Sequence, residues 1–106
     1  MTSISITKNS NMSAGNLILK KQGNLYNFSG TFVLTAALTS GTVELGTVDD
    51  SALIPPNNIM ATAYRLDSGL QYCRISCNTE GKIYVTYLGI TVPQGTWFYF
   101  NDCRML

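Results

Sequence analysis

Residues 83–100 read IYVTYLGITVPQGTWFYF, and this stretch decides the fold class. Two segments rich in β-branched and aromatic residues flank a connection with Gly, Pro and Gln, which is typical of two strands joined by a turn. Similar apolar segments recur along the last two-thirds of the chain, separated by gaps rich in Gly, Pro, Asn, Asp or Ser. This spacing leaves no room for a helix and predicts an all-β sandwich or barrel.

About eight strands are expected along the chain: residues 16–21, 25–30, 31–38, 42–48, 59–66, 70–77, 82–88 and 96–106. The third could instead be helical, since Ala and Leu favour helix, but its shortness and flanking glycines favour a strand. Residues 49–58 form the longest loop, because Pro55 and Pro56 exclude a central strand. The Asp67-Ser68-Gly69 segment is a turn signal.

The chain length of 106 residues predicts one domain. Residues 1–15 are rich in Ser, Asn and Thr, with a short alternation at Ile4 and Ile6. This segment is predicted to be a leader or a first edge strand, and residues 16–106 the β-sandwich domain.

Charge and hydropathy limit the partners. The net charge is +1 and the largest basic cluster is Lys20-Lys21, so we expect no nucleic-acid partner. No apolar run approaches the ~20 residues that span a bilayer, and the N-terminus lacks a secretory signal pattern. We therefore expect that the protein is made in a cytosol and does not insert into a membrane. Charged residues make up only 12%, against about 25% in typical domains. A surface so poor in charge is often partly covered by a partner.

The three cysteines predict neither a disulfide nor a metal site. Cys73 and Cys77 would point the same way along a strand but stand about 13 Å apart at ~3.3 Å per residue, beyond the ~7 Å that a disulfide tolerates. Cys103 leaves an odd number, and the chain has no His and no CxxC spacing. We expect free thiols packed as small apolar groups in the core, and no cofactor.

Catalysis is not expected. Without His, Ser-His-Asp and Cys-His nucleophile systems are excluded. A glycosidase needs two carboxylates that flank one sugar bond. Asp49 and Asp50 are adjacent and should diverge, whereas Asp67 and Glu80 stand in turn signals, where carboxylates have a local role.

Strand aromatics are the strongest candidates for binding. Tyrosine and tryptophan lie at alternating strand positions: Tyr72, Tyr84, Tyr87, Trp97 and Tyr99. Trp97 and Tyr99 share one face and Phe98 and Phe100 the other, so one pair faces the core and the other a subunit, a ligand or water. Trp97 is thus either a packing residue or a ligand contact. Flat rings stack on the apolar faces of sugars, and charged side chains could bind sugar hydroxyls or serve only solvation: Arg65, Asp67 and Arg74. In the same way Ile75 is expected to point inward, between outward-pointing Arg74 and Ser76.

The order of several motifs resembles one family. They are LKKQGN at 19–24, GTVELGTV at 41–48, EGKIYV at 80–85 and VPQGTW at 92–97. This series is similar to the C-terminal head domains of tailed-phage receptor-binding, baseplate and tail-fibre proteins, over about residues 16–101. The chain departs from the family pattern at Asp49-Asp50 and by placing Pro55-Pro56 later, so the specificity of that loop is not carried over.

The resemblance implies a jelly-roll-like antiparallel β-sandwich that forms a homotrimer and binds host cell-wall saccharide. It also implies a place in the virion, at a tail tip or fibre beside other tail or baseplate proteins. Four residues are the candidate saccharide ligands: Arg65, Asp67, Tyr72 and Trp97. Two alternatives stay open, a purely structural trimerising tip domain and a cellular β-sandwich lectin or carbohydrate-binding module. A monomer in solution would favour the lectin, and a trimer without glycan binding the structural tip.

Overall fold

The computed structural model describes residues 2–3, 6–67 and 69–106 and is built from strands. Their bounds are β1 Thr2–Ser3, β2 Ile6–Lys8, β3 Met12–Gln22, β4 Leu25–Leu34, β5 Gly41–Val48, β6 Ile59–Arg65, β7 Tyr72–Cys77, β8 Lys82–Tyr87 and β9 Trp97–Met105. One short 3₁₀ helix, η1, spans Ser51–Leu53.

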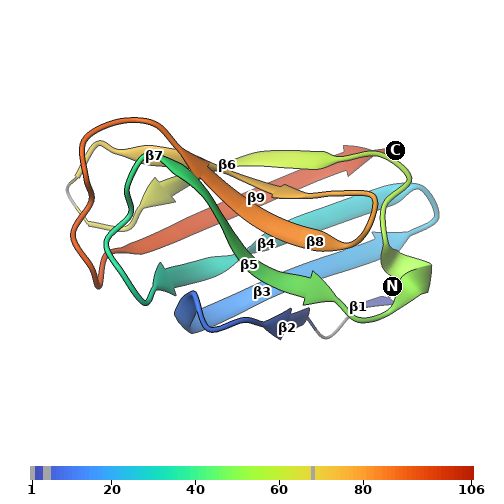
Figure 1. The fold of residues 1–106 in the computed structure, drawn as a ribbon. Coiled ribbons are helices and arrows are strands. Elements are labelled where there is room, and N and C mark those ends of the chain that lie inside the picture. Colours follow the sequence, from blue (N-terminus) through green and yellow to red (C-terminus); the bar gives the residue numbers. More distant parts are fainter. Residues whose placement is uncertain (1, 4–5, 68) are drawn as a thin grey trace.

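All these strands belong to one antiparallel sheet with the order β1-β3-β4-β9-β6-β7-β8-β5-β2. The sheet wraps over itself into two layers, with β3, β4 and β9 in one and β5, β6, β7 and β8 in the other (Figure 1). Because β2 at one end of the order also lies against β3 near the other end, the sheet is nearly closed. The predicted all-β antiparallel sandwich is confirmed, while the trimer stays a prediction.

The N-terminal segment joins both ends of this sheet. β1 pairs with β3, and β2 pairs with β5. Ile6 packs against the core, whereas Ile4, the other half of the expected alternation, lies outside the described residues. An edge-strand role fits these pairings. The domain boundary at residue 16 stays a prediction, and β3 runs across it.

The prediction of a separate strand over residues 31–38 is wrong. Residues 31–34 continue β4, and the chain then bends until Leu38 makes an isolated bridge with Val92. Gly30 does not end a strand but allows a close approach: a Cβ there would lie 2.1 Å from the carbonyl oxygen of Asn16 on β3. Its φ of +150° suits glycine, so Gly30 lies within the hairpin and allows β3 and β4 to pair closely, rather than marking the end of a strand.

The core lies between the two layers, and the alternating patterns predict its members. In β9 the Phe98 and Phe100 side chains are buried and Trp97 and Tyr99 are exposed, which confirms the alternation. Phe98 stacks on Phe32 with ring centroids 5.5 Å apart, so β9 and β4 hold the centre of the core together.

The cysteines divide between the two faces. Cys73 and Cys77 are buried on the inward face of β7 with Ile75 between them, as expected, and Arg74 is exposed. Cys103 is exposed on the outer face of β9, so the prediction of a core thiol is wrong there, because it shares the face of Trp97 and Tyr99. All three thiols are free.

The loop between β5 and β6 is held by its own side chains. Asp50 caps η1 by accepting a hydrogen bond of 2.9 Å from the backbone N–H of Ala52. Asp49 accepts from the Thr7 hydroxyl of β2 at 2.8 Å, while Leu53 and Pro55 are buried. The carboxylates of this loop therefore have structural partners.

Candidate functional site

The four candidate residues gather at one end of the sandwich. Arg65 ends β6, Tyr72 begins β7 and Trp97 begins β9, and Asp67 lies in the turn between β6 and β7. Arg65 pairs across strands with Phe98, the neighbour of Trp97. The 49–58 loop lies at the opposite end of the molecule (Figure 1), so the structure does not bring it to these residues.

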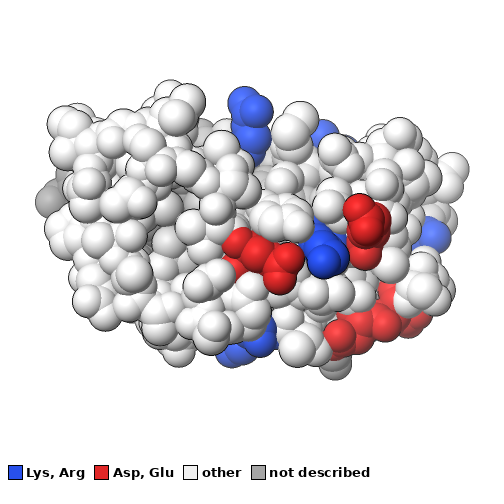
Figure 2. Space-filling view, viewed as in Figure 1, with Lys and Arg blue, Asp and Glu red and all other residues white. Residues whose placement is uncertain are grey.

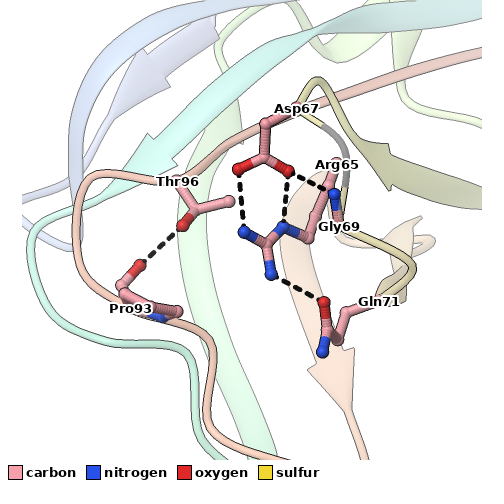
Figure 3. A network of polar contacts seen from close by, with 6 residues as sticks. All are labelled: Arg65, Asp67, Gly69, Gln71, Pro93 and Thr96. Carbon is pink, nitrogen blue, oxygen red and sulfur yellow. Dashed lines mark hydrogen bonds and ion pairs between the residues drawn. The ribbon is translucent and has the colours of Figure 1, made fainter.

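Arg65 and Asp67 form a clasp across the turn between β6 and β7 (Figure 3). The Arg65 guanidinium donates to both Asp67 carboxylate oxygens, from Nε at 2.9 Å and from Nη2 at 2.8 Å. Its Nη1 donates to Gln71 Oε1 at 2.6 Å, and the Gly69 N–H donates to Asp67 Oδ1 at 2.8 Å. Arg65 thus holds both ends of the turn, through the bidentate pair with Asp67 and through the hydrogen bond to Gln71. The predicted turn is confirmed, with Ser68 outside the described residues.

The clasp leaves its two members unequally accessible. The Arg65 side chain is 15% exposed and the Asp67 side chain 53%. The hydrogen bonds from Arg65, followed by that from the Gly69 N–H, lower the pKa of Asp67, and the hydrogen bond to Asp67 raises the pKa of Arg65. Asp67 therefore presents a carboxylate to solvent, while the Arg65 guanidinium donates its hydrogen bonds to Asp67 and Gln71.

Gly69 packs closely against this clasp. A Cβ at Gly69 would lie 2.2 Å from Arg65 Nε and 2.3 Å from Arg65 Cζ. The backbone of the turn therefore passes directly over the guanidinium, and a larger residue at position 69 would push the two apart.

An aromatic row lies on the outer face beside the clasp. Tyr64 pairs with Tyr99 of β9 on one side and with Tyr72 of β7 on the other. The ring centroids are 6.1 Å apart for Tyr64 and Tyr99 and 6.4 Å for Tyr64 and Tyr72. The residues are 50%, 45% and 63% exposed for Tyr64, Tyr99 and Tyr72. We call these three residues the tyrosine row; Trp97 stands two residues from Tyr99 on the same face.

Tyr64 is the residue that reasoning from the sequence missed. It stands at the centre of the tyrosine row, next to Arg65 at the end of β6. The signal was present, because in β6 the buried Ala61 and Ala63 alternate with outward Thr62 and Tyr64.

Two surface hollows adjoin these residues. A groove of about 510 Å³ runs beside Tyr72, Arg74 and Thr86 under the loop that carries Leu88 and Ile90. A second hollow of about 360 Å³ lies on the other side of the turn; its lining is Leu66, Asp67, Gln94, Gly95, Thr96 and Trp97. There the Thr96 hydroxyl donates a hydrogen bond of 2.9 Å to the carbonyl oxygen of Pro93, within the turn that precedes β9 (Figure 3). Tyr72 borders one hollow and Trp97 the other.

Charge is sparse around this end of the molecule. On the face shown in Figure 2 the charged side chains lie over the middle and over the half that holds the 49–58 loop, and the remaining half is white. Besides the clasp and Arg74, the loops at this end expose aliphatic side chains: Leu66, Leu70, Leu88 and Ile90. Such a surface favours contacts through apolar faces over ionic ones.

Within the described residues, no group of three or more potential metal ligands is found. No helix in the same part of the chain is long and apolar enough to cross a membrane.

Comparisons with known proteins give one kind of match. No protein-family model matches the chain, and no curated protein matches it. Among solved structures, the receptor-binding head domain of the lactococcal phage bIL170 matches with a TM-score of 0.77 and 16% sequence identity. The match covers 99% of this chain and 97% of that chain. The resemblance predicted from the sequence is thereby confirmed for the fold: the chain has the architecture of a phage receptor-binding head domain.

Proposed function

We propose that this chain is the receptor-binding head domain of a tailed phage and that it recognises a saccharide on the host cell surface as a homotrimer. The observation that carries the proposal is the end-to-end structural match to a phage receptor-binding head domain. The domain acts at the tip of a tail or fibre, beside other tail or baseplate proteins, after synthesis in the host cytoplasm.

The saccharide site is assigned to the end of the sandwich that holds Arg65, Asp67, Tyr72 and Trp97. Tyr72 and Trp97 offer exposed rings for sugar faces, and the exposed Asp67 carboxylate can accept hydrogen bonds from sugar hydroxyls. Arg65 holds that carboxylate in place through two hydrogen bonds. The site is shallow, so single-site affinity should be weak, and three copies on one trimer raise avidity without new contacts.

The homotrimer is supported by the composition of the chain. Charged residues make up only 12% of it, and obligate interfaces are more apolar than ordinary surface, so a surface this poor in charge suits subunit contacts.

A binding role without catalysis and without a cofactor is part of the proposal. Four carboxylates have local hydrogen-bond partners: Asp49 with Thr7, Asp50 with Ala52, Asp67 with Arg65 and Asp102 with Arg104. These carboxylates are engaged with donors of the protein itself, whereas a glycosidase needs two carboxylates that flank one sugar bond.

The test is binding of fluorescently labelled protein to a panel of Gram-positive and Gram-negative cells, with free cell-wall polysaccharide as competitor. We expect binding to some strains, loss of binding with competitor, and weaker binding of Tyr72→Ala and Trp97→Ala. Binding that resists the polysaccharide but is lost after protease treatment of the cells would indicate a protein receptor instead. A trimer that binds no cell would favour the structural tip domain, and a monomer that binds glycan would favour a lectin.

A further inference from the structure

The tyrosine row has a geometry that a single sugar unit would not use. Its three rings come from three adjacent strands, β9, β6 and β7, and lie at steps of 6.1 and 6.4 Å. Each step is comparable with the length of one hexose unit in an extended glycan. The planes of neighbouring rings are inclined to each other by 41° for Tyr64 and Tyr99 and by 43° for Tyr64 and Tyr72.

The chemistry around the row suits a neutral polyhydroxylated chain. Polar uncharged side chains continue the same cross-strand register beyond Tyr99, through Thr31 of β4 to Asn16 of β3. Among the tyrosine hydroxyls of the described residues, only that of Tyr87 is hydrogen-bonded to the protein. The hydroxyls of the row are therefore free to bond to a ligand.

The row also has a direction, because it leads into the groove of about 510 Å³. Tyr72 is both the last ring of the row and a wall of that groove. Beyond it the outer face carries Thr62, Arg74 and Thr86, which pair side by side across β6, β7 and β8. The aromatic row thus leads into a groove lined by polar and by aliphatic side chains, the latter from Leu88 and Ile90.

We infer that the outer face of β9, β6 and β7 is a linear track that binds an internal stretch of a glycan chain, at least three sugar units long, rather than a chain end or a single sugar. The inference rests on the proposed saccharide binding and adds the length and the path of the ligand. Tyr64 is the central contact, and the groove beside Tyr72 takes the continuing chain.

The test measures affinity as a function of ligand length. Polysaccharide is released from a strain that binds the protein, and fragments of one to six sugar units are separated by size. Isothermal titration of the intact protein should show affinity rising at least about tenfold from one to three units, as successive rings are engaged. Affinity that is the same for one unit as for three would overturn the track, and would leave saccharide binding intact.

Variants locate the track on the surface. Tyr64→Ala should lower the affinity for the three-unit fragment about fivefold or more, and Tyr64→Phe should retain most of it, because the ring is the main contact. Tyr84→Ala is the matched control, since Tyr84 is half-buried on β8 and outside the row and the groove. Equal losses for Tyr64→Ala and Tyr84→Ala would contradict the assignment.

Two further outcomes are distinguishable. If Tyr64→Ala dissociates the oligomer in light scattering, the row is a contact between copies of the chain and the track is refuted. If the unmodified protein binds no polysaccharide from any strain, the proposed function fails and this inference fails with it.

Discussion

Ile75 should contribute more to stability than its neighbour Arg74 by a wide margin. Ile75 lies at the centre of β7 with no exposed surface, opposite buried Ala61 on β6 and buried Val85 on β8. Arg74 points the other way and is exposed. The pair therefore tests which face of β7 packs against the core.

The magnitude follows from the burial of Ile75. Ile75→Ala removes three buried carbon atoms, and at about 0.8 kcal/mol each the lost transfer free energy is roughly 2.5 kcal/mol. The neighbours belong to hydrogen-bonded strands and can collapse only partly, so a cavity term raises the loss to about 3–4 kcal/mol. Arg74→Ala removes a solvated side chain and should cost under about 1 kcal/mol.

The assay is urea denaturation followed by tryptophan fluorescence, with Ile75→Val as a graded control that should cost about 0.5–1.5 kcal/mol. The protein concentration is kept constant between variants, because subunit association would make the midpoint depend on it. If Arg74→Ala proved the more destabilising change, the register of β7 would be shifted by one residue and every side chain of the strand would be on the wrong face.

Three further predictions concern the clasp and the thiols. The pKa of Asp67 is lowered in the folded state, so its charged form stabilises the fold at pH values above the unfolded pKa of about 3.9. This contribution is lost as the pH falls through the lower pKa of the folded state. In urea titrations Asp67→Asn should therefore be less stable than the unmodified protein at pH 7, and the difference should shrink below about pH 4. In Ellman titration at pH 8 the native chain should show one reactive thiol, Cys103, and the denatured chain three. The reason is that burial raises the pKa of Cys73 and of Cys77 to about 12. Three reactive thiols in the native state would contradict the placement of Cys73 and Cys77 on the inward face of β7. Gly69→Ala should push the turn and the Arg65 guanidinium apart, seen as faster amide hydrogen exchange between β6 and β7. Gly23→Ala lies in the turn between β3 and β4, where its φ of +60° strains the backbone but a Cβ meets no atom within 4 Å, and it should leave the exchange between β6 and β7 unchanged.

Much of the sandwich was predictable because its signals are local. Alternation with a period of two predicted that Phe98 and Phe100 lie on the opposite face of the strand from Trp97 and Tyr99, and the same rule placed Ile75 in the core. The family resemblance predicted the architecture, which the bIL170 head domain shares at 16% identity. Glycine was the weak signal: Gly30 looks like a strand end in the sequence, but its use depends on the carbonyl of Asn16 on the next strand.

The candidate site was predictable only in part. Arg65 and Asp67 were chosen as separate polar residues, and their spacing along the chain does not reveal that they bind each other through two hydrogen bonds. Asp49 and Asp50 belong to the loop that looked distinctive in the sequence, yet it lies at the far end from Trp97 (Figure 1).

The sequence alone shows which side chains of a strand share a face and where most of the turns lie, because these depend on the two-residue repeat of a strand and on the dihedral preferences of turn residues. Only the tertiary structure decided which strands are neighbours. Tyr64 is 8 residues from Tyr72 and 35 from Tyr99, and it meets both because β6 pairs with β7 on one side and β9 on the other. Strand order depends on how the whole sheet buries its apolar face, and no short stretch of sequence contains that information.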